Sequence, residues 1–388
     1  MSVTGPAGFV AAGVACGIKP AGALDMALVA AADGAVPAAA TFTRNRACAA
    51  PVQVSREHLR TSRGRARAVV LNSGNANAAT GAPGQRDALR MAELTAAGLG
   101  CAAAEVLVCS TGLIGYPLPM AQVEQGVAAA VAAAGPRPED GAAAARAIMT
   151  TDTAPKTVQL SGTGFSVAGM AKGAAMLAPD MATMLAVLTT DADVDPSRLP
   201  VLLRGAVDES FNRLSVDGCT STNDTVIVMA SGRAGPVDET ELGLLLVDAC
   251  ADLAAQMAVD AEGATRVAVI TVTGARDDDQ AAAAARRVAE SQLVQCSIHG
   301  ADPYWGRVVS ELGSAGITFE MDRVSVSYGG VLVCRDGMAL DHDRDAVARH
   351  VDGPRVDIHA DLGLGPGRAG VLTTALSPAY IAENERTS

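Results

Sequence analysis

The sequence predicts a mixed α/β fold, a sandwich whose sheets are covered by helices, with a smaller α/β unit at the C-terminus. Short apolar runs of β-type residues alternate along the chain with longer helix-type segments, which is the pattern of helices packed on sheets. Hydrophobic residues make up 49% of the 388 residues but aromatic residues only 3%, so we expect cores of Ala, Val, Leu and Met. A chain of this length can form two or three such cores.

The predicted strands are short apolar runs bounded by turn residues. They cover 38–43, 68–71, 106–109, 158–160, 225–230 and 267–272, and a further set lies within 317–333. The predicted helices are longer and cover 83–99, 120–133, 138–149, 199–212, 239–259 and 278–293. Stretches rich in Gly or Pro predict linkers at 135–138, 231–236 and 274–279, and the C-terminal unit is predicted to start at about residue 275.

Charge and composition exclude several classes of protein. The net charge of −12 argues against a nucleic-acid partner, because phosphate binding needs clustered Lys and Arg. The apolar runs at 127–134 and 181–188 are shorter than the roughly 18 to 20 residues of a membrane span, and no secretory signal is apparent. We therefore expect a cytoplasmic protein with no membrane partner. The eight cysteines form no C-x-x-C pair, so we expect reduced thiols, no metal site and no cofactor.

Four polar clusters each adjoin an apolar run or a helix-type segment: 72–77, 110–115, 149–153 and 219–224. The first is typical of a structural loop. In the second, the Thr111 hydroxyl and the Gly112 N–H could form an oxyanion hole, although Thr-Gly is also common in turns. For the third and fourth, considered alone, helix capping is the default interpretation. Only three lysines occur, at 19, 156 and 172, a skew typical of genome composition.

Thr183 lies behind a small residue in an apolar run, and two interpretations stay open for it. Its β-branched side chain suits a buried strand. If the Ala182–Thr183 bond is cut, Thr183 instead becomes an N-terminal nucleophile whose own α-amine serves as its base.

The stretch from Lys172-Gly173 through Ala178-Pro179-Asp180-Met181-Ala182-Thr183-Met184-Leu185 closely resembles the self-cleavage signature of the ornithine acetyltransferase (glutamate N-acetyltransferase) family. The other clusters match this family in the same order, and so do Asp260-Ala261-Glu262-Gly263 and Asp302-Pro303-Tyr304-Trp305-Gly306-Arg307. The resemblance extends from residue 8 to about residue 384.

The resemblance implies self-cleavage into an α chain, 1–182, and a β chain, 183–388, that stay associated as a heterotetramer or larger oligomer. It implies transfer of the acetyl group from N2-acetyl-L-ornithine to L-glutamate through an acetyl-Thr183 intermediate, in arginine biosynthesis and with small amino-acid substrates as the partners. Acetyl-CoA stays open as a second donor. The implied oxyanion hole is Thr111 with Gly112. The implied substrate contacts are Thr150, Lys172, Thr183, Glu262, Asn384 and a terminal hydroxyl residue, Ser388 or Thr387.

Three other functions stay open at this point. A Thr-nucleophile amidase or aminopeptidase would transfer the acyl group to water instead of an amine. An acetyltransferase of a specialised-metabolite pathway would accept other amino acids. A catalytically silent binding or scaffold protein would use all four clusters as structural loops.

Overall fold

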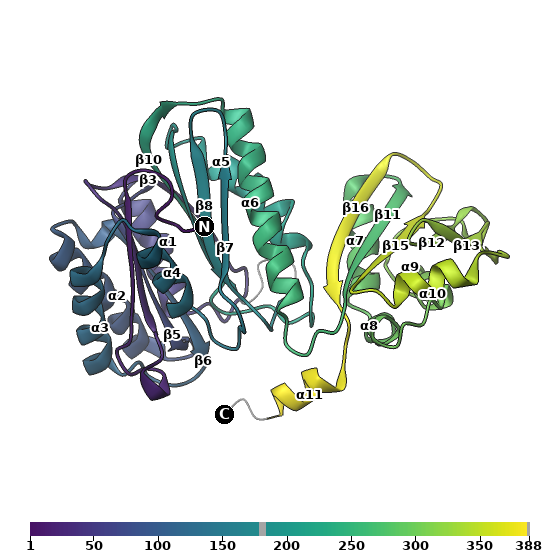
Figure 1. Ribbon diagram of the computed structural model, residues 1–388, viewed down its shortest axis with the longest axis horizontal. Coiled ribbons are helices and arrows are strands. Elements are labelled where there is room, and N and C mark those ends of the chain that lie inside the picture. The colour runs from purple at the N-terminus through teal and green to yellow at the C-terminus, as the bar shows by residue number, and fades with distance from the viewer. Residues whose placement is uncertain (178–183, 386–388) are drawn as a thin grey trace. The chain divides into compact units, whose positions relative to one another are not determined.

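The structure is a computed structural model that describes residues 1–177 and 184–385 (Figure 1). The chain divides into two compact units. The N-terminal unit comprises 1–212 and 219–257, and the C-terminal unit comprises 213–218 and the residues from 258 onward. The mixed α/β class predicted from the sequence is confirmed.

Two mixed sheets make up the centre of the N-terminal unit. The first has the strand order β1 (Phe9–Val14), β2 (Met26–Ala31), β5 (Ala68–Asn75), β6 (Val106–Leu113). The second has the order β4 (Arg65–Ala66), β3 (Val36–Phe42), β10 (Thr225–Pro236), β9 (Leu185–Asp193), β8 (Ser166–Lys172), β7 (Lys156–Ser161). The pairs β5–β6 and β9–β10 are parallel, whereas the other pairings in these two sheets are antiparallel.

The two sheets pack face to face. One buried core cluster takes alternate residues from both of them, including Val29, Leu71 and Leu107 from the first sheet and Met170, Val187 and Ile227 from the second. The intervening residues of the first sheet, such as Leu28, Val70 and Val108, instead pack in a cluster with helix residues that include Met91 and Val123. This alternation is the period-two pattern of strands that are buried on both faces.

Helices cover these sheets: α1 (Ala50–Thr61), α2 (Gly81–Leu99), α3 (Met120–Ala133), α4 (Pro138–Ala147), α5 (Leu199–Asp208) and α6 (Glu239–Val259), with short 3-10 turns at Pro20–Gly22, Ala103–Glu105 and Phe211–Arg213. The close approach of α4 to β1 depends on small residues. A Cβ atom at Gly13 would lie 2.1 Å from the Ala143 carbonyl oxygen, so only glycine fits there. Helix α4 ends at Ala147, three residues before Thr150, and its packing therefore positions the third polar cluster.

Helix α6 is, among the described residues, the one helix whose length and apolarity would allow it to cross a membrane. It is instead part of the core, since Leu242, Leu246 and Leu253 are completely buried. Near its end, Gln256 exchanges two hydrogen bonds of 3.1 Å with the backbone of Thr157 in β7.

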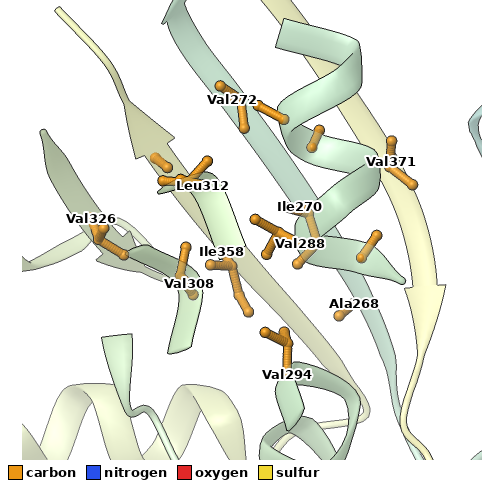
Figure 2. Packing of buried hydrophobic residues seen from close by; sticks show 14 of the residues in the cluster. Ala268, Ile270, Val272, Val288, Val294, Val308, Leu312, Val326, Ile358 and Val371 are labelled. Atoms are coloured by element: carbon orange, nitrogen blue, oxygen red, sulfur yellow. The ribbon is translucent and has the colours of Figure 1, made fainter. Parts of the chain in front are cut away.

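The C-terminal unit has one sheet, ordered β14 (Met338–Ala339), β13 (Val331–Arg335), β12 (Ser325–Tyr328), β15 (Arg355–Asp361), β11 (Val267–Ala275), β16 (Gly367–Thr374). Its helices are α7 (Asp278–Ala289), α8 (Gln292–His299), α9 (Trp305–Gly313), α10 (Arg344–Val351) and α11 (Pro378–Asn384), with a 3-10 turn at Met321–Arg323. Figure 2 shows Ile270, Val288 and Ile358 in its aliphatic core.

Two boundaries in this part of the chain differ from the sequence-based expectation. The main segment of the unit starts at Ala258 and not near residue 275, and it includes β11, which pairs with β15 and β16 in this sheet. The single helix expected over 278–293 is two helices. The Ser291 side chain accepts a hydrogen bond from Val294 N and caps a new helix, α8.

Candidate active site

The predicted oxyanion donors lie at the end of β6, next to the end of β5. Because these two strands are parallel, their carboxyl ends meet at the same edge of the sheet. Ser73 lies opposite Thr111 and Gly74 lies opposite Gly112. Thr111 is buried, at 2% exposure. The fold thus brings the first two polar clusters together.

Gly112 has a backbone conformation and a neighbourhood that a side chain would disrupt. Its φ angle is +131°, and a Cβ atom would lie 2.3 Å from the Gly74 carbonyl carbon and 2.5 Å from Asn75 N. The glycine is therefore required for the close approach of the two strand ends.

Because the Gly112 N–H is one of the two predicted oxyanion donors, we expect Gly112→Ala to lower the kcat of the enzyme by about 100-fold or more, the effect of losing one such donor. The matched control is Gly115→Ala in the same loop. Gly115 also has a positive φ, +89°, but nothing lies within 4 Å of a Cβ there. Steady-state kinetics of the two variants check this, and equal losses would contradict a specific role for Gly112.

The third and fourth clusters do not cap helices, so the default interpretation of them was wrong. Residues 219–224 precede strand β10, and residues 149–153 follow the end of α4. Their polar side chains instead bind backbone groups of neighbouring strands. Asn223 Nδ2 donates hydrogen bonds to the carbonyl oxygens of Ala76, at 2.6 Å, and Ser110, at 2.9 Å. Asn223 therefore ties both strand ends to its own loop, next to Thr111.

Asp224, the next residue, binds the chain immediately after the predicted nucleophile. Its Oδ1 accepts a hydrogen bond of 2.9 Å from Met184 N, and Met184 is bonded to Thr183. The carboxyl is completely buried, and within the described part of the chain no donor reaches its Oδ2. Burial raises the pKa of Asp224 well above its usual value, although the Met184 and Ser221 hydrogen bonds and the charge of Lys172 oppose this.

Asp152 is the centre of a buried charge cluster. The Lys156 ammonium lies 2.6 Å from its Oδ1, and the Lys172 ammonium lies 3.9 Å from its Oδ2. Two backbone groups also donate to it, Gly173 N at 2.8 Å and Thr150 N at 2.9 Å. The cluster thus joins the end of β8, the start of β7 and the loop after α4.

The charge of this cluster favours the ionised form of Asp152. Burial alone would raise its pKa, but the charges of Lys172 and Lys156 and the hydrogen bonds outweigh burial and lower the pKa to about 2. Lys19 lies close enough for its charge to act on the same carboxylate, and its Nζ donates to the Met149 carbonyl oxygen at 3.0 Å. All three lysines of the chain therefore act on the charge of Asp152, and two of them lie within 4.0 Å of it.

The other predicted residues have separate places. Thr150 and Lys172 lie in the N-terminal unit, whereas Glu262 and Asn384 lie in the C-terminal unit. There, Asn384 Nδ2 donates to Glu262 Oε2 at 2.8 Å, and Glu262 lines a cavity of about 160 Å³. Ala182, Thr183 and Ser388 lie outside the described residues. Within 1–177 and 184–385, no group of three His, Cys, Asp or Glu side chains is placed to hold a metal ion.

Sequence reasoning missed Asp152, Lys156, Asp224 and Lys19 as members of the site. Both aspartates stand in clusters that were noted but interpreted as helix caps. The rarity of lysine was the other available signal, since only three of 30 Lys and Arg residues are lysines. Genome composition accounts for the same rarity, and nothing local indicates that the three lie together.

Comparison with known proteins gives matches along nearly the whole chain. A family model described as the ArgJ family matches residues 10–387. The chain is similar to the "Arginine biosynthesis bifunctional protein ArgJ" of Thermobifida fusca, with 49% identity over 390 residues and 100% coverage of both chains. The protein of the same name from Mycolicibacterium paratuberculosis is also 49% identical, with 100% of this chain and 96% of that protein covered.

One solved structure with high sequence identity is the ornithine acetyltransferase of Mycobacterium tuberculosis complexed with ornithine. It is 51% identical in sequence and has a TM-score of 0.44, with 46% of this chain and 94% of that chain covered.

Proposed function

Because the chain belongs to the ArgJ family, we propose that it transfers the acetyl group of N2-acetyl-L-ornithine to L-glutamate. The products are L-ornithine and N-acetyl-L-glutamate, and the protein is an acyltransferase of arginine biosynthesis. The match over residues 10–387 supports this, as does the 49% identity with a bifunctional relative over the full length of both chains. Acetyl-CoA is a second candidate donor.

The proposed mechanism begins with hydrolysis of the Ala182–Thr183 bond. The Thr183 hydroxyl attacks the Ala182 carbonyl, the C–N bond breaks to leave an ester and a free Thr183 amine, and water then hydrolyses the ester to give the Ala182 carboxylate and the Thr183 hydroxyl. The Thr183 hydroxyl then attacks the acetyl carbonyl of the donor while its own amine accepts the hydroxyl proton. Thr111 and the Gly112 N–H stabilise the oxyanion that forms. The C–N bond breaks, the proton passes to the leaving nitrogen, and ornithine departs.

The second half of the proposed reaction repeats these steps in reverse. The glutamate amine attacks the acetyl ester of Thr183, and the same donors stabilise the second oxyanion. When the C–O bond breaks, the Thr183 oxygen regains a proton and N-acetylglutamate leaves. Two acyl transfers thus replace one direct amide exchange.

The observation that supports this assignment best is the hydrogen-bonded link through Asn223 and Asp224. Asn223 binds the carbonyl of Ser110, the residue before Thr111, and Asp224 binds the N–H of Met184, the residue after Thr183. Two adjacent residues therefore hold the predicted oxyanion strand and the segment that follows the predicted nucleophile.

We propose the substrate contacts separately for each unit. Thr150 and Lys172 contact substrate in the N-terminal unit, where the Lys172 ammonium pairs with a carboxylate. In the C-terminal unit, Glu262 pairs with an amine of ornithine and Asn384 orients it, with Ser388 or Thr387 as the terminal contact. We also propose that the α and β chains stay associated, form a heterotetramer or larger oligomer, and work in the cytoplasm.

Ornithine release tests the function. The purified protein is incubated with N-acetylornithine, with and without glutamate, and free ornithine is measured. We expect one rapid turnover without glutamate, from acetylation of Thr183, and continuous release with it. Continuous ornithine release at a rate that does not depend on glutamate would indicate a hydrolase. No ornithine release at all would indicate a binding protein.

A further inference from the structure

Lys19 is held in place by a loop that folds around one carboxylate. Asp25 Oδ2 accepts hydrogen bonds from the backbone N–H groups of Gly17, Ile18 and Lys19, at 3.0, 2.7 and 2.9 Å. Its Oδ1 accepts a further one from Cys16 N at 2.7 Å. Four charge-assisted bonds therefore determine where the Lys19 side chain starts.

The Lys19 side chain runs from the carboxyl ends of β5 and β6 toward residues 149–153, the loop that follows α4. Its Cγ atom would lie 2.9 Å from a Cβ built on Gly74, the residue opposite Gly112. At its other end, Nζ donates to the carbonyl oxygen of Met149 at 3.0 Å. Lys19 thus contacts two of the segments that carry the proposed catalytic and substrate groups.

The Lys19 ammonium keeps donor capacity for a ligand. An ammonium has three N–H donors, and Met149 uses one of them. Among residues 1–177 and 184–385, no carboxylate lies within 4.0 Å of it. The carboxylate of Asp152 is already held by Lys156 and lies near Lys172, and that of Asp25 is held by the four backbone groups.

Charges of both signs act on the Lys19 ammonium. The Asp25 and Asp152 carboxylates attract it, and the Lys172 ammonium repels it. Burial lowers the pKa of Lys19, the two carboxylates oppose this, and the charge of Lys172 adds to the lowering. An additional anion would relieve this repulsion.

We propose that Lys19 binds the side-chain carboxylate of the acceptor glutamate and thereby selects a dicarboxylate acceptor. This inference rests on the proposed function. Both substrates have an α-carboxylate, for which one cation, Lys172, suffices, whereas glutamate alone brings a second carboxylate.

The test compares glutamate with glutamine, which has the same shape but no side-chain charge. In Lys19→Met, we expect kcat/KM for glutamate to fall roughly 10- to 100-fold, which corresponds to the loss of one charged hydrogen-bonded pair. The kcat/KM for glutamine should change little, so the glutamate preference collapses. The rate of the first turnover with N-acetylornithine, measured without acceptor, should fall much less than kcat/KM for glutamate does, because ornithine has no second carboxylate.

Two further variants control the result. Lys19→Arg keeps the charge and should retain most of the preference for glutamate over glutamine. If Lys19→Met folds poorly, this variant still tests the role of the charge. Arg146→Met removes an exposed charge from neighbouring α4. It should leave kcat/KM unchanged for both glutamate and glutamine. Equal losses for glutamate and glutamine in Lys19→Met would overturn the inference. Failure of the wild-type protein to transfer acetyl to glutamate would instead overturn the proposed function.

Discussion

Replacing Thr183 with alanine is expected to leave the chain uncut and to abolish acetyl transfer. The variant lacks the hydroxyl that would attack the Ala182 carbonyl, and it also lacks the oxygen that would hold the acetyl group. Loss of a nucleophile of this kind lowers kcat by about 10⁴-fold or more. Intact-mass analysis should find two chains, 1–182 and 183–388, for the native protein and one chain for the variant. Ornithine release should fall to background.

Thr189→Ala is the matched control for this experiment. Thr189 lies in β9, six residues further along, and its hydroxyl donates to the Val3 carbonyl oxygen at 2.8 Å. Its loss should cost about 1 kcal/mol of unfolding free energy and leave cleavage intact. Thr183→Ser, which keeps a hydroxyl, should still be cut. A single full-length species in the native protein would overturn the cleavage proposal.

Asp152→Ala is expected to lower the free energy of unfolding by roughly 3–5 kcal/mol, the effect of leaving buried charges without their partner. Lys156 and Lys172 would lose the carboxylate between them, and their side chains are only 2% and 3% exposed. Urea denaturation monitored by circular dichroism measures this change. The same variant should bind substrate less well, because Lys172 would lose one of the charges that position it.

Glu57→Ala serves as the control, since Glu57 forms an ion pair with Arg60 in which both side chains are more than half exposed. Pairs of this kind contribute little, so no measurable change in stability is expected. If Asp152→Ala were as stable as this control, the charge cluster would not contribute to folding.

The stabilisation from Asp152 should depend on pH in a defined direction. Its pKa is about 2 in the folded protein and about 3.9 in an unfolded chain, so the folded state binds the proton less readily. The carboxylate therefore stabilises the fold above about pH 4, and this contribution is lost as the pH falls toward 2. The difference in unfolding free energy between the native protein and Asp152→Ala should shrink over that range. A constant difference would contradict the assigned pKa.

Helix and strand patterns in the sequence predicted the elements that carry most of the site, because hydrophobic periodicity is a local property. The runs at 68–71 and 106–109 became β5 and β6, each extended by residues of a polar cluster. The break between α7 and α8 was missed, because its cause is one hydroxyl cap at Ser291 inside a continuous helical pattern. The start of the C-terminal unit was also misplaced, because strand pairing is a long-range property.

Thr111 and Gly112 could be proposed from the chain alone, since a hydroxyl and a glycine N–H side by side are recognisable as donors wherever the chain places them. The sequence alone could not show whether Asp152 pairs with Lys156 or caps a helix, because a carboxylate in a short polar segment suits either role. For Lys19 the rarity of lysine was the one signal in the chain, since its neighbours Gly74 and Met149 are distant in sequence.

Local patterns were therefore enough to predict the α/β class and to single out Thr183, Thr111 and Gly112 as candidate reacting groups, because each of these patterns is formed by residues close together in the chain. Tertiary packing alone decided that the charges of three lysines act on Asp152 and that Asp224 binds the N–H of Met184. The physical reason is that Coulomb interaction and burial depend on distance in space. Lys19 and Asp152 are 133 residues apart in the chain, but the fold brings them within range of each other's charge.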